Sequence, residues 1–308
     1  IILSYPTIID LECLHLITKI GQRRMYMIHN AYAKLNILLN VHGKYFNGYH
    51  SIESIMLPID LHDTLEIEAI SNSSDIIIEC SDLNIPQNEN NILYKCAKLF
   101  QNEFKIPDGV KIFLQKNIPT QSGLGGESTD AACLMHFFNN TYKLNLSYDN
   151  IFYLGRLLSW DVPICYFQKC MYINDKINIC EEITPKNLLY FLLVKPSFGV
   201  STKNAFEKLD RIDYKNVSSQ PILDAFQYFP QNVGKHLHNC FINTDDRLIN
   251  EFNLGVQLSE KLGFDGFSMS GTGSCFFAIT TDKTILTNGY EYFHDKYSFV
   301  EATSIKIS

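Results

Sequence analysis

The chain has 308 residues and a mass of 35.4 kDa, a length at which one large domain or, more commonly, two domains form. Apolar residues make up 46% and charged residues 19%, which excludes an intrinsically disordered chain, and no apolar run predicts a membrane span. The net charge of −7 argues against a nucleic-acid-binding protein, which needs a broad basic face.

Residues 1–26 fit neither a secretory signal nor a transit peptide. We expect an ill-ordered extension here, with Met25 or Met27 as a candidate start, or else a short amphipathic helix. The chain has nine cysteines, an odd number, and no two of them have the close spacing of a zinc or redox motif. We therefore expect reduced thiols and a cytoplasmic protein; an organelle of the plastid type is the alternative.

From residue 28 onward the pattern is regular. Apolar and polar residues alternate from Ala33 to Val41, which predicts a strand that ends at Gly43. Further periodicity in the first half predicts strands at 64–70, 75–80 and 110–119 and helices at 91–104, 128–139 and 149–158. The second half predicts a buried strand at 187–195 and helices at 201–210, 221–228, 232–239 and 251–262. The fold class is therefore α+β, with a domain boundary between residues 165 and 190.

A glycine-rich loop lies between a strand and a helix in the string PTQSGLGGESTDAACLMHFF, residues 119–138. Gly123, Gly125 and Gly126 let successive backbone N–H groups turn toward an anion, and the helix N-terminus adds further donors. The loop is not a P-loop, because no Lys follows its last Gly. It is not a dinucleotide fingerprint either, because Ser128 stands at the third glycine position. An empty turn capped by Ser128 is the alternative interpretation.

Four strings, taken together and in this order, resemble the GHMP kinase superfamily over residues 28 to 280. They are AYAKLN (31–36) with GYH (48–50), PTQSGLGGESTDAA (119–132), SWDVP (159–163) and MSGTGS (269–274). The resemblance implies a two-domain α+β GHMP kinase fold, with an N-terminal ATP-binding domain at 27–176 and a C-terminal domain at 177–308. The active site would lie in the cleft between these domains.

The implied reaction is phosphoryl transfer from ATP to a small molecule. Within the superfamily, the strings are most similar to members that phosphorylate the 2-hydroxyl of 4-diphosphocytidyl-2-C-methyl-D-erythritol, in the non-mevalonate isoprenoid pathway. Asp161 would be the catalytic base, and Lys34 would lie beside it, keep it ionised and polarise the nucleophile. Mg²⁺ is expected with ATP, but the metal ligands are not identified.

The resemblance also assigns the binding residues. Asn36 would hydrogen-bond the substrate, Tyr49 would stack on cytosine, and His50 would satisfy the polar edge of the base. A second aromatic ring is expected at Phe198, with Thr202 nearby. ATP contacts are expected from Asn91, Lys116, Pro119, Thr120, Gln121, Ser122, Gly123, Leu124, Gly125, Gly126, Glu127, Ser128 and Thr129, and the second glycine loop comprises Ser270, Gly271, Thr272 and Gly273.

Three residues depart from the superfamily pattern, namely Glu127, Ser159 and Trp160, which stand where small residues are usual. We expect Glu127 to point outward or to help hold Mg²⁺. Two alternatives stay open: another GHMP kinase of the homoserine or mevalonate type, and a catalytically weakened nucleotide-binding regulator. The GYH string favours an acceptor that carries a nucleobase. The expected partners are small molecules, without nucleic acid or membrane, and the protein is expected to be a monomer or homodimer.

Overall fold

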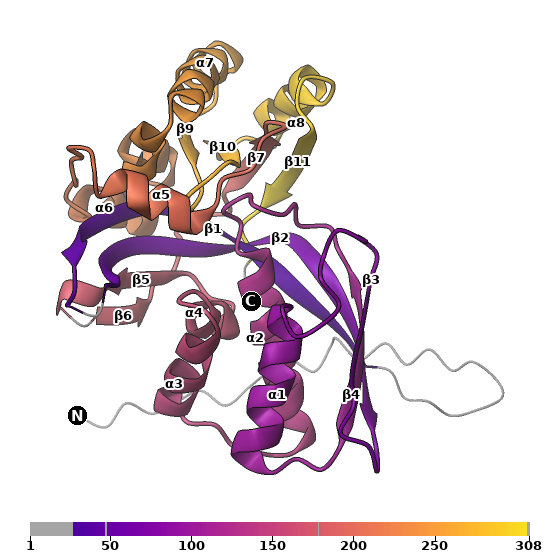
Figure 1. Cartoon of the computed structure of the whole chain (residues 1–308). Helices are drawn as coiled ribbons and strands as arrows, with labels where there is room; N and C mark the ends of the chain where they lie inside the picture. The colour runs from indigo at the N-terminus through magenta and orange to yellow at the C-terminus, as the bar shows by residue number, and fades with distance from the viewer. Residues whose placement is uncertain (1–26, 47, 178, 307–308) are drawn as a thin grey trace.

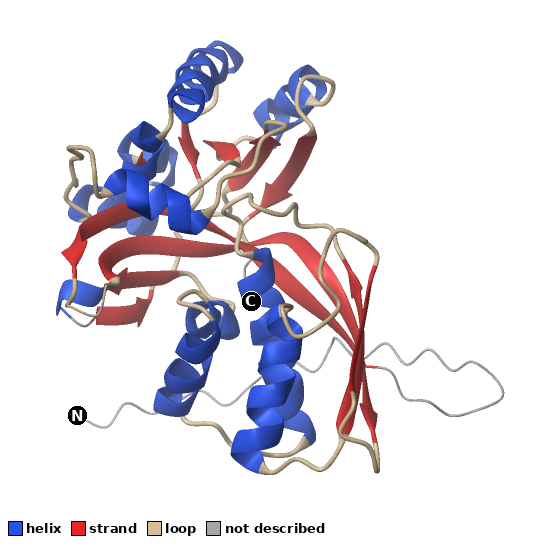
Figure 2. Cartoon of the chain, in the orientation of Figure 1, coloured by secondary structure: helices blue, strands red, loops and turns tan. Residues whose placement is uncertain are grey.

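The structure, a computed structural model, describes residues 27–46, 48–177 and 179–306. The expected extension at 1–26 lies outside these residues. Within them, the chain forms one sheet of seven strands and one of four, with helices packed on both (Figures 1 and 2). The predicted α+β class is confirmed. In the described ranges, no helix is both long and apolar enough to cross a membrane.

The first sheet is built on two long antiparallel strands, β1 Met27–Lys44 and β2 His50–Ile70. The order of the main path is β3-β4-β2-β1-β8, and a short β5-β6 pair is attached to β2. The other strands are β3 Ile76–Cys80, β4 Gly109–Gln115, β5 Met171–Asn174, β6 Ile179–Glu182 and β8 His238–Asn239. The strand predicted at 110–119 ends early because the N–H groups of Asn117 and Ile118 donate to the Asp63 carboxylate instead of a neighbouring strand.

Four helices lie together on one side of the long strands (Figure 1). They are α1 Ile92–Phe104, α2 Gly126–Thr141, α3 Tyr148–Leu158 and α4 Val162–Phe167. Helix α2 is buried on almost every side, which explains why its sequence shows little helical periodicity. It begins earlier than predicted, with Gly125 as its N-cap at φ 74°, so Ser128 lies inside the first turn and does not cap the helix.

The second sheet is antiparallel, in the order β11-β7-β10-β9. Its strands are β7 Tyr190–Lys195, β9 Gly266–Met269, β10 Phe276–Thr280 and β11 Phe299–Ser304. The helices of this half are α5 Thr202–Leu209, α6 Gln220–Tyr228, α7 Asp246–Leu262 and α8 Lys283–Phe293. The helix predicted at 232–239 is wrong: the chain forms a 3₁₀ turn at Pro230–His236 and then β8, which pairs with β1.

One apolar cluster joins the two sheets. Ala33, Leu35 and Ile37 of β1 pack in the same cluster as Phe191 of β7 and Phe277 of β10. Strand β6 pairs with β5, and β5 pairs with β2, so the first sheet continues to Glu182. The expected boundary at 176/177 therefore separates two paired strands, and the change from one sheet to the other follows β6.

Candidate active site

A cavity of about 990 Å³ is lined by residues from both halves of the chain. Strand β1, the glycine-rich loop, the start of α4, helix α5 and the second glycine loop all contribute to its wall. Most of the predicted site residues meet here although they lie far apart in the sequence.

Lys34 and Asp161 form an ion pair in this cavity, with 3.2 Å between Nζ and Oδ2. Lys34 stands on β1 and its side chain is only 8% exposed, whereas Asp161, the N-cap residue of α4, is 26% exposed. The Asp161 carboxylate does not cap its own helix, which leaves its oxygens available to Lys34 and to a ligand. The expected proximity of the two groups is therefore present.

Asn36 holds the other side of the Lys34 ammonium. Lys34 Nζ donates to Asn36 Oδ1 at 2.7 Å, and Asn36 Nδ2 donates to the hydroxyl of Ser54 at 2.8 Å. That hydroxyl donates to the carbonyl of Leu38 at 2.7 Å. All three polar side chains are buried. The chain of hydrogen bonds fixes the lysine in position before any ligand binds.

The glycine-rich loop is bonded to both halves of the molecule. The N–H of Lys34 donates to the carbonyl of Leu124 at 2.9 Å, and the N–H of Cys275 donates to the carbonyl of Ser122 at 2.9 Å. The Ser270 hydroxyl donates to the carbonyl of Gly123 at 3.0 Å. The two glycine loops therefore form one connected unit.

Two positions of the first loop require glycine, both because the backbone has a positive φ and because neighbouring atoms leave no room for a Cβ. A Cβ on Gly123, at φ 77°, would lie 2.1 Å from the carbonyl oxygen of Ser270. A Cβ on Gly125, at φ 74°, would lie 2.8 Å from Cγ of Lys34. The glycines thus bring the loop against the catalytic lysine candidate and leave the N-terminus of α2 open toward the cavity.

Lys116 forms a buried cluster with two carboxylates that the sequence analysis did not identify. Its Nζ contacts Asp63, and it lies 3.1 Å from Oδ2 of Asp130. Burial opposes the charge on Lys116, but Asp130 and Asp63 outweigh it and raise the pKa of the lysine. Burial also raises the pKa of Asp130 to about 8; Lys116 opposes this shift, and the neighbouring Asp63 carboxylate adds to it. Lys116 lines the cavity, but its charge is already neutralised.

The other expected ATP contacts divide into two groups. Asn91 lines the cavity, while its side chain caps α1 by accepting from the N–H of Leu93 at 2.8 Å. Glu127 is exposed and lines the cavity wall. Leu124 and Thr129 do not line the cavity: Leu124 packs in the core, and Thr129 donates its hydroxyl to the carbonyl of Tyr32 at 2.8 Å. The members of the expected list that line the wall are Asn91, Lys116, Pro119, Thr120, Gln121, Ser122, Gly123, Gly125, Gly126, Glu127 and Ser128.

The second glycine loop contributes less surface than expected. Gly271 and Thr272 line the cavity, and the hydroxyls of Thr272 and Thr202 lie 3.3 Å apart. Ser270 and Gly273 do not line it. Ser270 instead accepts from the N–H of Asn36 at 3.3 Å, so it connects β1 to the loop.

Aromatic and imidazole rings gather at the end of the cavity near the β1-β2 turn. Tyr49 and His50 line the wall there, and the ring of Phe206 on α5 stacks on that of His50 with centroids 4.6 Å apart. Phe198, the expected second aromatic, does not line the cavity; its ring lies under the guanidinium of Arg247 at 4.6 Å. Phe206 takes its place at the wall because α5 turns that side chain toward the hairpin.

Sequence reasoning also missed Asp63, Asp130, Asp210 and Phe206. A signal existed for Asp63, an acid within a strand pattern, and for Asp130, an acid in the buried helix after the loop. Nothing in the sequence showed that both would contact Lys116. Phe198 and Phe206 lie at equal distances in sequence before and after Thr202, and only the position of helix α5 shows which of the two rings reaches the cavity.

A sequence profile described as the GHMP kinases N terminal domain matches residues 91–169. The chain is 34% identical over 275 residues to a 4-diphosphocytidyl-2-C-methyl-D-erythritol kinase of Clostridium perfringens, covering 87% of this chain and 94% of that protein. It is 34% identical over 293 residues to the enzyme of the same name from Clostridium novyi, covering 90% and 99%. The crystal structure of a 4-(cytidine 5'-diphospho)-2C-methyl-D-erythritol kinase shares the fold, with a TM-score of 0.76 at 24% identity over 92% of this chain and 100% of that one.

Proposed function

The chain belongs to the 4-diphosphocytidyl-2-C-methyl-D-erythritol kinase family of the GHMP kinases, and from this premise we propose the reaction that it catalyses. The protein transfers the γ-phosphoryl group of ATP to the 2-hydroxyl of the methylerythritol moiety of 4-diphosphocytidyl-2-C-methyl-D-erythritol, a step of the non-mevalonate isoprenoid pathway. The observation that carries the proposal is the ion pair of Lys34 and Asp161 beside the glycine-rich loop in a cavity that also holds a tyrosine and a histidine.

Asp161 accepts the proton of the acceptor hydroxyl as the oxygen attacks the γ-phosphorus, and ADP leaves with the electrons of the broken bond. Lys34 stabilises the ionised carboxylate and the developing charge on the attacking oxygen. Asn36 keeps the ammonium directed at the reacting groups through its 2.7 Å hydrogen bond. Its amide is engaged by Lys34 and Ser54, so it acts on the substrate mainly through the lysine.

The triphosphate needs positive charge from groups other than Lys34 and Lys116, because both lysines are paired with carboxylates. The open N-terminus of α2 supplies backbone donors and the positive end of the helix dipole. Lys95 and Lys203 are exposed lysines in the cavity wall and add two full charges. These features fit a polyphosphate.

Bound together with ATP, Mg²⁺ would supply the remaining neutralisation of the phosphate charge. Within the described ranges, no group of three or more His, Cys, Asp and Glu side chains is arranged to hold a metal ion. The oxygens of Asp161, Ser128 and Glu127 in the cavity wall suit a hard cation that keeps most of its ligands from phosphate and water.

The cytosine ring binds at the hairpin end of the cavity. Tyr49 and Phe206 offer the two aromatic faces for stacking, and His50 offers polar ring nitrogens to the edge of the base. A homoserine or mevalonate kinase has no nucleobase to place there, which is why the diphosphocytidyl acceptor is favoured. The eight described cysteines are free thiols, in keeping with a cytoplasmic enzyme, and we propose a monomer or homodimer.

The test is ADP release measured with ATP, Mg²⁺ and one acceptor at a time. We expect turnover with 4-diphosphocytidyl-2-C-methyl-D-erythritol and background rates with homoserine and mevalonate. Turnover with either small acceptor alone would contradict the proposal. ATP-dependent thermal stabilisation without ADP formation from any acceptor would instead identify a nucleotide-binding regulator.

A further inference from the structure

His50 is held by a carboxylate from the other half of the chain. Its Nε2 lies 2.6 Å from Oδ1 of Asp210, the residue at the C-terminal cap of α5. The second oxygen of Asp210 accepts a hydrogen bond from Nζ of Lys44 at 3.0 Å. Phe206, which stacks on the His50 ring, stands one helical turn before Asp210. One face of α5 therefore fixes both the plane of the imidazole and the direction of its Nε2.

The position of the donated proton on His50 follows from this contact. The hydrogen bonds from His50 and Lys44 lower the pKa of the Asp210 carboxyl, so it is ionised near neutral pH and can only accept hydrogen bonds. Nε2 must therefore carry a proton. Lys44 occupies the other oxygen of Asp210, which leaves Oδ1 to the imidazole. In the imidazole tautomer that carries its proton on Nε2, Nδ1 is an acceptor.

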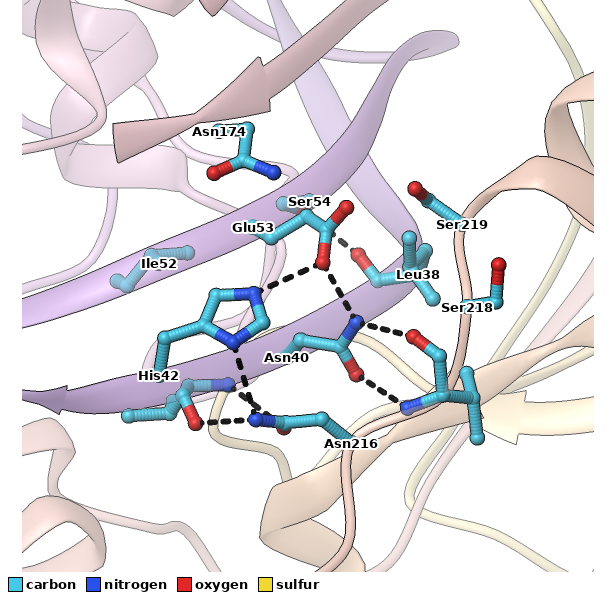
Figure 3. A network of polar contacts seen from close by, with 12 residues as sticks. Leu38, Asn40, His42, Ile52, Glu53, Ser54, Asn174, Asn216, Ser218 and Ser219 are labelled. Atoms are coloured by element: carbon cyan, nitrogen blue, oxygen red, sulfur yellow. Dashed lines mark hydrogen bonds and ion pairs between the residues drawn. The ribbon is translucent and has the colours of Figure 1, made fainter. Parts of the chain in front are cut away.

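The segment that carries Asp210 is anchored to β1 a few residues further on (Figure 3). The Asn216 side chain bonds both backbone groups of Val41, at 2.7 and 3.1 Å. Asn40 likewise bonds both backbone groups of Val217, at 2.8 and 3.2 Å. Asn40 and His42 in turn donate to the buried carboxylate of Glu53, each at 2.9 Å. The connection after α5 is thus tied to the strand that leads into the turn before His50.

We propose that Asp210 is a specificity-determining positioning residue, which makes Nδ1 of His50 a hydrogen-bond acceptor and so selects cytosine over uracil. The inference rests on the proposed function and deepens it. At the position where cytosine presents an amino donor, uracil presents a carbonyl acceptor. An imidazole whose Nδ1 only accepts pairs with the amino group and repels the carbonyl oxygen. Neither Asp210 nor Lys44 needs to contact the base.

Asp210→Asn tests this directly. The amide can donate to Nε2, which moves the ring proton to Nδ1 and turns the acceptor into a donor. We expect the ratio of kcat/KM for 4-diphosphocytidyl-2-C-methyl-D-erythritol to that for its uridine counterpart to fall by about 10- to 100-fold, the size of one mismatched hydrogen bond in a partly desolvated site. Asp210→Glu keeps an anionic acceptor and should retain most of the preference.

The ratio is measured within one variant, so it does not depend on the fraction of folded protein. Asp224→Asn, an exposed carboxylate on α6, makes the same chemical change away from the cavity and should leave the ratio unchanged. An unchanged ratio in Asp210→Asn, with an active wild type, would overturn this inference alone. A wild-type protein that does not phosphorylate the cytidine acceptor would overturn the proposed function, and this inference with it.

Discussion

The ammonium of Lys34 lies 3.2 Å from the carboxylate of Asp161, and it also donates to Asn36 at 2.7 Å. The first residue comes from the strand that begins the described chain, the second from the start of α4. The ammonium is thus held between a fixed amide and a partly exposed carboxylate. The carboxylate can accept a proton in this position because no reorganisation is needed when the substrate arrives.

Asp161→Asn should remove the proton acceptor while preserving the size of the side chain. We expect kcat to fall by about 10²- to 10⁴-fold with KM for both substrates changed little, as for loss of a general base. The measurement is steady-state ADP release with each substrate varied. Asp149→Asn, on the exposed first turn of α3, is the matched control. Full turnover of Asp161→Asn would contradict the assignment of the base.

Gly125→Ala should disturb the lysine through the loop. The added Cβ would meet Lys34 Cγ at 2.8 Å, and the residue would be held at φ 74°. We expect at least about tenfold lower kcat/KM and a loss of about 1–2 kcal/mol in the free energy of unfolding. The control is Gly263→Ala, at φ 86° with its nearest neighbour 3.5 Å away, which should lose similar stability but keep its activity. Equal activity in the two variants would refute the role of close packing.

Phe206→Leu separates the two aromatic candidates for cytosine binding. Loss of a stacking ring should raise KM for the diphosphocytidyl acceptor about tenfold, with little effect on KM for ATP. Phe198→Leu changes a ring that lies against Arg247 outside the cavity and should leave both KM values near those of the wild type. A raised KM for the acceptor in Phe198→Leu, with an unchanged KM in Phe206→Leu, would instead assign the stacking ring to Phe198.

The buried cluster at Lys116 makes a prediction about pH. Burial raises the pKa of Asp130 from its ordinary 3.8 to about 8, so between these values the folded protein keeps a proton that the unfolded chain loses. The contribution of Asp130 to the free energy of unfolding is therefore fully present below about pH 4, and it is lost as the pH rises through about 8. Between pH 5 and pH 8 the free energy of unfolding, measured in urea, should fall less for Asp130→Asn than for wild type, by roughly 3–4 kcal/mol. Equal falls would contradict the raised pKa.

Part of the fold was predictable because its signals are local. The β1 alternation and the helix pattern at 91–104 need only neighbouring residues, and both elements are present. The predictions at 110–119 and 232–239 failed because contacts distant in sequence decide those segments. The Asp63 carboxylate ends β4, and pairing with β1 makes β8.

The sequence by itself determined the kinase family, because the glycine loop and the residues around Lys34 and Asp161 occur in short strings of recognisable type and order. Only the tertiary structure decided what each charge does. Lys116 is recognisable as a cation from the sequence, but its contacts with Asp63 and Asp130 depend on a strand, a loop and a helix meeting in three dimensions. The same holds for Asp210, whose effect on His50 exists only because α5 packs against the β1-β2 hairpin. Electrostatic and hydrogen-bond interactions depend on distance in space, which sequence spacing does not specify.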